Sequence, residues 1–248
     1  MDISDGISGR SLVSPGEASV ENVRFPRVAG EQGALPAAVL WDIDGTLVDT
    51  EPYWMECEFE LARKYGGTWT HEDGLAIVGG ALIDSATYIR EHMGIDRTPL
   101  QIVEELLDGV VERIERAVPW RPGARELLAE LREQEVPCAL VTMSWRRFVE
   151  PVVRALPPGS FEVLVCGDEV ANGKPHPEPY LRAAELLGLA AQETIAIEDS
   201  PTGATSAEAA GCLVLCVPSQ VPVPQGRRRV IRETLVGLEP RDLATFGF

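Results

Sequence analysis

The chain has 248 residues, of which 45% are hydrophobic and 25% charged, and its formal net charge at pH 7 is -17. This length allows one large domain, or a core domain with a smaller insertion, with a hydrophobic core that needs no disulfides. The strong negative charge repels phosphate backbones and anionic lipid, which argues against nucleic acid and membranes as partners. Any phosphate site must therefore supply its own local cations.

The N-terminal residues and the cysteines indicate a cytoplasmic protein. Residues 1–33 are rich in Gly, Ser, Pro and charge, which predicts a mobile N-terminal extension. The start MDISDGISGR is acidic where a secretory signal would be basic and then apolar, and no apolar run reaches membrane-spanning length. The five cysteines lie mostly in apolar runs, as buried reduced thiols do.

The folded part is expected to begin near Leu35, with a buried strand over 37–41. From 51 to 118 apolar and aromatic residues recur at helical spacing, and no strand is expected there. After Gly123, helix and strand alternate. The pattern predicts helices over 124–134, 178–187 and 202–210, and strands over 136–141, 161–166, 194–197 and 212–217.

This alternation predicts an α/β fold with a doubly wound parallel sheet, because near-continuous apolar strands are buried on both faces. Residues 34–50 and 119–248 then form the α/β core, and residues 51–118 form a helical insertion. In such sheets ligands bind at the carboxyl ends of the strands.

Polar residues follow the predicted strands and should meet at one edge of the sheet. They are Asp42 and Asp44, Thr142 and Ser144, Lys174 in a loop, and Glu198 with Asp199. Carboxylates so close together repel one another unless a cation lies among them. Oxygen ligands without clustered His or Cys favour a hard ion, and a site that also takes a phosphate oxygen suits Mg²⁺.

These residue types fit transfer of a phosphoryl group. The carboxylate of Asp42 would attack phosphorus to give an aspartyl-phosphate, while Mg²⁺ and Lys174 offset the charge on the phosphate. Thr142 and the loop that includes Ser144 would bind the phosphoryl oxygens. Asp44 would protonate the leaving oxygen and later take a proton from water.

Four segments closely resemble the motifs of the haloacid dehalogenase-like hydrolase superfamily. They are Asp42-Ile-Asp-Gly-Thr-Leu-Val-Asp49-Thr50, Thr142, Gly173-Lys-Pro-His-Pro177 and Ile197-Glu-Asp-Ser200. The resemblance spans residues 35–217 and implies a Rossmann-like core with residues 51–118 as its helical cap. It implies Asp42 as nucleophile and Asp44 as acid/base. Mg²⁺ would be held by the Asp42 carboxylate, the Asp44 carbonyl and Asp199, assisted by Glu198.

The nearest branch by resemblance contains beta-phosphoglucomutase-like enzymes and small sugar-phosphate phosphatases. There, Asn or Ala usually follows the Thr or Ser of the second motif, whereas here Met143 follows Thr142. The leading function is a Mg²⁺-dependent phosphatase acting on a small phosphate monoester. Sugar phosphates, phosphoglycolate, glycerol phosphate and nucleotide monophosphates all remain candidate substrates.

Other functions stay open beside the phosphatase. A sugar-phosphate mutase would use the same residues, but mutases commonly carry a basic residue in the stretch that here spans 79–85, which has none. A dehalogenase would share the nucleophile but needs no metal, so the additional carboxylates argue against a dehalogenase. A non-catalytic binding protein is the third alternative. No pattern in the sequence indicates an oligomeric state.

Several residues near these motifs have structural interpretations. Asp49 or Thr50 is expected to cap the first helix of the insertion through its side chain. The three histidines have no metal-ligand spacing and are expected at the surface or in packing. Trp54, Tyr65 and Trp69 fit either a substrate cavity or packing between cap and core.

Overall fold

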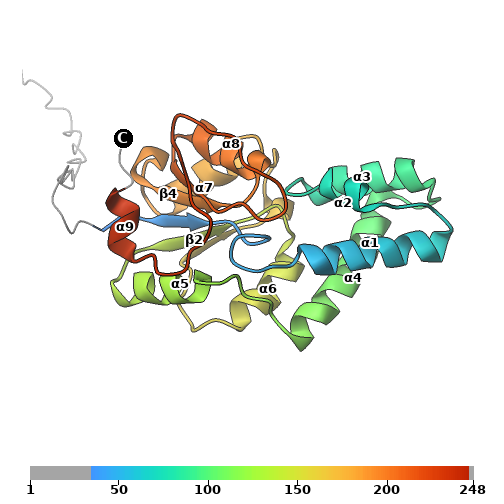
Figure 1. Cartoon of the computed structure of the whole chain (residues 1–248), viewed down its shortest axis with the longest axis horizontal. Helices are drawn as coiled ribbons and strands as arrows, with labels where there is room; N and C mark the ends of the chain where they lie inside the picture. The colour runs from blue at the N-terminus through green and yellow to red at the C-terminus, as the bar shows by residue number, and fades with distance from the viewer. Residues whose placement is uncertain (1–34, 246–248) are drawn as a thin grey trace, which may run out of the picture. The chain divides into compact units, whose positions relative to one another are not determined.

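A six-stranded parallel sheet lies at the centre of this computed structural model, which describes residues 35–245 (Figure 1). The strand order is β3-β2-β1-β4-β5-β6. The strands are β1 (Val39–Trp41), β2 (Cys138–Val141), β3 (Val163–Val165), β4 (Ile195–Glu198), β5 (Leu213–Cys216) and β6 (Arg229–Ile231). The predicted doubly wound parallel sheet is confirmed. The extension predicted over residues 1–33 lies outside the described residues.

Helices cover both faces of the sheet, which explains why its strands are apolar throughout. Side chains of Val39 and Trp41 join one core cluster, and Leu40 between them joins the other. The first cluster includes residues of α5 (Ala124–Glu133), α6 (Arg146–Arg154) and α9 (Pro240–Thr245), and the second those of α7 (Glu178–Leu186) and α8 (Pro201–Ala210).

The segment 51–118, called the cap segment below, contains helices and no strand. Its helices are α1 (Glu51–Tyr65), α2 (His71–Leu75), α3 (Leu82–Met93) and α4 (Pro99–Arg116). The longest, α4, starts with a capping box in which Thr98 and Gln101 bond each other's backbone amides. It packs closely on α1 at Gly109, where a Cβ would lie 2.7 Å from the Cys57 sulfur. The division into core and cap domains stays a prediction.

All five cysteines are buried and free, as predicted. Cys57 lies in α1 of the cap segment, and the other four lie in or next to strands of the sheet. Burial raises the pKa of the Cys57 thiol to about 12 and that of Cys212 to about 11. Within residues 35–245, no helix is both long and apolar enough to cross a membrane.

Candidate active site

Asp42 lies at the point where the order of strands reverses. After β1 the chain builds β2 and β3 on one side and then returns to place β4 on the other side of β1. The backbone N–H of Asp42 donates to the carbonyl of Ile197 at 3.0 Å, which extends the pairing of β1 with β4. Asp42 therefore lies beside the end of β4. Carboxylate oxygens of Asp42, Glu198 and Asp199 lie within 4.8 Å of one another.

The turn after β1 depends on a glycine. Gly45 has a φ of +81°, and a Cβ there would lie 2.1 Å from Oδ2 of Asp199 and 2.2 Å from Oε1 of Glu51. Only a residue without a side chain lets the turn pass so close to both carboxyl groups. The turn thus brings Glu51, the first residue of α1, next to the carboxylates of the sheet.

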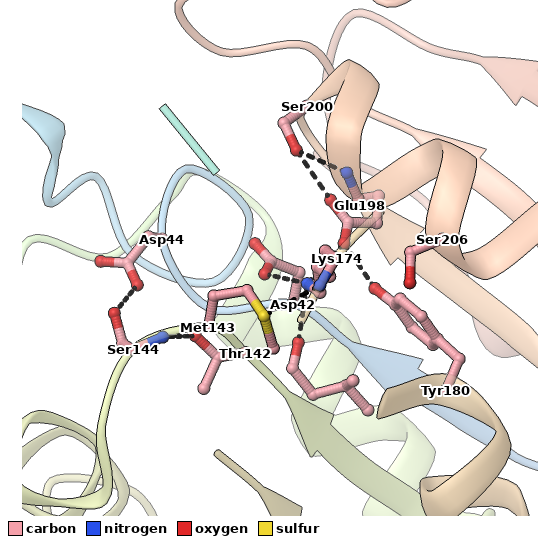
Figure 2. Close-up of polar contacts among 12 residues, drawn as sticks. Asp42, Asp44, Thr142, Met143, Ser144, Lys174, Tyr180, Glu198, Ser200 and Ser206 are labelled. Atoms are coloured by element: carbon pink, nitrogen blue, oxygen red, sulfur yellow. Dashed lines mark hydrogen bonds and ion pairs between the residues drawn. The ribbon is translucent and has the colours of Figure 1, made fainter. Parts of the chain in front are cut away.

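Lys174 is a buried cation at the floor of the site. Its Nζ donates to Oδ1 of Asp42 at 2.7 Å, to Oε1 of Glu198 at 2.6 Å and to the carbonyl of Val141 at 2.9 Å (Figure 2). These bonds use all three donors of the ammonium group. Burial lowers the pKa of Lys174, but the ion pairs with Asp42 and Glu198 outweigh burial and hold it above its usual value. Lys174 therefore stays charged.

Glu198 is fully buried and positions Lys174. Its Oε1 also accepts the hydroxyl proton of Tyr180, and its Oε2 lies 3.4 Å from the hydroxyl of Ser200. A Cβ at Gly203, in the first turn of α8, would lie 2.0 Å from its carboxylate oxygens. Glu198 is thus confined by α8 and bonded to Lys174, and these contacts limit the part it could take in holding a metal.

Asp44 accepts hydrogen bonds from three side chains. Its Oδ1 accepts from the hydroxyl of Thr50 and from Nε1 of Trp54 at 2.9 Å, and its Oδ2 accepts from the hydroxyl of Ser144 at 2.6 Å. The expected capping of α1 by the Thr50 side chain is wrong: Thr50 is the N-cap residue, but its hydroxyl bonds Asp44 instead of the helix.

The loop after β2 supports both Lys174 and Asp44. Oγ1 of Thr142 accepts the backbone N–H of Ser144 at 3.0 Å. The sulfur of Met143 accepts the backbone N–H of Lys174 at 3.0 Å, and a Cβ at Gly173 would lie 2.7 Å from it. The unusual methionine of the second motif therefore packs beneath the loop that holds the lysine.

Three carboxyl groups of the site, those of Asp42, Asp199 and Glu51, have raised pKa values because they are buried close to other carboxylates. Burial and the charge of Glu198 raise the pKa of Asp42 to about 7, against the lowering effect of Lys174. Burial and Asp42 raise the pKa of Asp199 well above its usual range, and burial and Asp44 raise that of Glu51 to about 8. Oδ2 of Asp199 and both carboxyl oxygens of Glu51 are buried without a hydrogen-bond partner among the described residues. A divalent cation with oxygen ligands fits this set, because it would supply both the charge and the partners.

A cavity of about 280 Å³ separates these residues from the cap segment. All the predicted site residues except Glu198 line it: Asp42, Asp44, Thr142, Ser144, Lys174 and Asp199. From the cap segment, Trp54 and His71 reach the cavity. Tyr65 and Trp69 do not line it, since the hydroxyl of Tyr65 bonds Glu105 and the ring of Trp69 packs on Tyr88.

Three residues of the site were not predicted. Glu51 and Glu58 line the cavity from α1, and Tyr180 bonds Glu198 from α7. Glu51 follows Asp49 at the start of a helix, where acidic side chains are common because of the helix dipole. That pattern gave no reason to assign it to the site, whereas the structure shows its side chain buried against the turn at Gly45.

The parallel sheet, the carboxylates at its switch point and the helical segment inserted after β1 describe an α/β protein with a charged site beside the cap segment. The family described as haloacid dehalogenase-like hydrolase matches residues 39–217. Hexitol phosphatase A of Escherichia coli is 35% identical over 194 residues, which cover 75% of this chain and 85% of that protein. The chain therefore belongs to the haloacid dehalogenase-like hydrolases.

Solved structures show the same fold. CbbY of Rhodobacter sphaeroides, in complex with xylulose-1,5-bisphosphate, has a TM-score of 0.73 at 24% identity and covers 82% of this chain and 96% of its own. Beta-phosphoglucomutase of Clostridium difficile has a TM-score of 0.72 at 20% identity, covering 86% and 97%. The expected branch and the expected enzyme class, a phosphoric monoester hydrolase, are confirmed.

Proposed function

We propose that the protein is a Mg²⁺-dependent phosphatase of small phosphorylated metabolites that works through an aspartyl-phosphate on Asp42. The observation that carries this proposal is the placement of Asp42 at the floor of the cavity, with Lys174 bonded to one carboxylate oxygen at 2.7 Å. A fixed neighbouring cation favours the ionised carboxylate, which is the form that attacks phosphorus.

Mg²⁺ fits the carboxylates of Asp42 and Asp199 and the backbone carbonyl of Asp44, with Glu198 as a further oxygen donor nearby. When bound, the ion would neutralise charge on the phosphoryl oxygens and on the carboxylates. The raised pKa values of Asp42 and Asp199 support this assignment, because a divalent ion would offset the burial and the neighbouring carboxylate charges that raise them.

The reaction then runs in two steps. A carboxylate oxygen of Asp42 forms a bond to phosphorus while the ester oxygen leaves and takes a proton from Asp44. In the second step Asp44 takes a proton from water, whose oxygen attacks phosphorus and releases inorganic phosphate and the free carboxylate of Asp42. Lys174 offsets charge on the phosphoryl group, and Thr142 and amides of its loop bind the phosphoryl oxygens.

The relatives support a phosphorylated sugar or polyol as the substrate. One is named hexitol phosphatase and another, 30% identical and from Thermotoga maritima, phosphorylated carbohydrates phosphatase. The five buried free thiols support a reducing compartment such as the cytoplasm.

The experiment measures phosphate release from a panel of phosphorylated metabolites with Mg²⁺ or EDTA, using wild type, Asp42→Asn and the exposed control Asp96→Asn. We expect Mg²⁺-dependent release that only Asp42→Asn abolishes. Beta-glucose 1-phosphate primed with its bisphosphate belongs in the panel. Isomerised sugar phosphate with little free phosphate would favour the mutase, and no turnover by folded protein would favour a binding protein.

A further inference from the structure

The cap side of the cavity carries no fixed positive charge. Among the described residues, Lys174 is the only lysine or arginine that lines the cavity, and its three donors are already bonded to Asp42, Glu198 and Val141. His71 contributes an imidazole at an exposed position of α2. The rest of the cap wall is largely apolar, formed by Met55, Leu75, Ile77, Val78, Leu82, Ile89 and Leu106.

Glu58 is one of the polar residues of the cap segment that line the cavity beside this apolar wall, as Ser85 is. Its side chain is 5% exposed, and Oε2 accepts the indole N–H of Trp69 at 2.9 Å. Oε1 has no hydrogen-bond partner among residues 35–245, although Glu58 lines the cavity. Trp69 itself is held between the cap helices by edge contacts with Tyr88 and His92. Glu58 is therefore a fixed carboxyl group with one oxygen left to bind a ligand.

Gly74 of α2 packs against the side chains of Glu58 and Met55. A Cβ at Gly74 would lie 3.0 Å from Oε2 of Glu58 and 2.5 Å from the Met55 methyl group. A larger residue there would press on both side chains. The pKa of Glu58 is raised by burial to about 7, so its carboxyl group can either accept a hydroxyl proton or donate its own.

We propose that this half of the cavity selects phosphate esters whose alcohol is uncharged, and that Glu58 hydrogen-bonds a hydroxyl of that alcohol. The inference rests on the proposed function and narrows its substrate. A second anion, such as the carboxylate of phosphoglycolate or another phosphate, would lose water against an apolar wall that offers two carboxyl groups, Glu51 and Glu58, and no permanent cation. An uncharged alcohol loses less on leaving water than an anion does, and one of its hydroxyls can hydrogen-bond the free oxygen of Glu58.

The test compares kcat/KM for sorbitol 6-phosphate, phosphoglycolate, fructose 1,6-bisphosphate and p-nitrophenyl phosphate in the presence of Mg²⁺. We expect kcat/KM for sorbitol 6-phosphate to exceed the values for phosphoglycolate and fructose 1,6-bisphosphate, whose alcohol parts are themselves anions, by about 100-fold or more. In Glu58→Ala the ratio of sorbitol 6-phosphate to p-nitrophenyl phosphate turnover should fall at least roughly tenfold, because a hydroxyl contact is lost. Glu91→Ala, an exposed carboxylate of the same segment, should keep the wild-type ratio.

A second variant, Glu58→Gln, keeps the inference testable if Glu58→Ala does not fold. Glu58→Gln keeps the volume and the acceptor for Trp69, and should lower the same ratio less than Glu58→Ala. A wild-type enzyme that hydrolyses phosphoglycolate as well as sorbitol 6-phosphate would overturn the inference and leave the phosphatase intact. Loss of that phosphoglycolate activity in His71→Asn would then identify the imidazole as the missing cation.

Measurements of ligand binding test this inference independently of the proposed phosphatase activity. If no ester is hydrolysed, calorimetry of sorbitol 6-phosphate and phosphoglycolate with Asp42→Asn in Mg²⁺ still reports the selectivity of the cavity. Preference for the polyol phosphate, weakened by adding Glu58→Ala, would support the inference without phosphatase activity. Equal binding, reversed preference or no binding of either compound would overturn it.

Discussion

The indole nitrogen of Trp54 donates a hydrogen bond of 2.9 Å to Oδ1 of Asp44. Trp54 belongs to α1 of the cap segment, and Thr50 at the N-cap of the same helix donates to the same oxygen. Two of the three donors to Asp44 therefore belong to one helix, and the third, Ser144, comes from the loop after β2. The orientation of Asp44 depends on where α1 lies.

Replacing Trp54 by Phe should affect esters according to their leaving group. The ring would still pack, but Asp44 would lose an orienting donor and would protonate the leaving oxygen less well. We expect kcat for an alkyl phosphate ester to fall roughly tenfold or more. Turnover of p-nitrophenyl phosphate, whose leaving group needs little protonation, should fall much less. Steady-state kinetics of both esters, with Trp120→Phe as the control, test this; equal losses would show a merely structural role.

Mg²⁺ should stabilise the protein through Asp199. A ligand that binds only the folded state adds about 2.7 kcal/mol at 100 times its dissociation constant, equivalent to a rise in Tm of roughly 5–10 °C. Asp199→Asn should abolish most of this shift, whereas the exposed Asp96→Asn should retain it. Because the pKa values of Asp42 and Asp199 are raised, binding should also release protons near pH 7, measurable by calorimetry in buffers of different ionisation enthalpy.

Lys174→Met should strongly lower the free energy of unfolding. Removing the ammonium group leaves Asp42 and Glu198 buried without their cation, a loss of about 3–5 kcal/mol. The only other lysine of the chain, Lys64, is exposed and pairs with Glu105, so Lys64→Met is a matched control that should change little. Urea denaturation monitored by fluorescence gives both values. Similar stabilities of the two variants would contradict the buried ion pairs.

Glu58 should make stability depend on pH. Its pKa is about 7 in the folded protein and near 4.5 when unfolded, so between these values the folded state binds the extra proton. The contribution of Glu58 to the free energy of unfolding therefore falls as pH rises through this window and levels off above pH 7. Glu58→Gln should make this slope less steep, because Asp42 and Glu51, whose pKa values are also raised, keep their own contributions. The variant should be more stable than wild type at pH 8 by at most about 3 kcal/mol. Urea denaturation from pH 5 to pH 8 measures the slope in both proteins. If the variant shows the same slope as wild type, groups other than Glu58 cause the pH dependence.

The sequence predicts the sheet well because its buried strands are continuous apolar runs. It fails for β6, a three-residue edge strand preceded by Arg227 and Arg228, where no such run exists. It also fails for α6, which contains Pro151 and starts at Trp145 without a side-chain cap. Both elements form through packing against neighbours rather than through a local pattern.

The site was predicted where polar residues end strands and missed where they lie on helices. Asp42, Lys174 and Asp199 follow strands or motifs, so topology alone brings them together. Glu51 and Glu58 look in the sequence like other glutamates of an exposed helix face. Only tertiary contacts, with Gly45 in one case and Trp69 in the other, show that they are buried. The sequence offers Asp49 or Thr50 as the cap of α1 and does not indicate that the Thr50 hydroxyl bonds Asp44, six residues away.

The buried cysteine thiols can report local opening of the structure through their rates of chemical modification. A thiol with a pKa near 12 hardly reacts at neutral pH, so labelling requires that its surroundings open to solvent. Cys57 samples the contact between α1 and α4, and Cys138 samples strand β2 of the sheet. The rate at which a thiol reagent modifies Cys57 would measure local opening of the cap segment, and the rate at Cys138 would measure opening of the sheet. No additional cysteine has to be introduced.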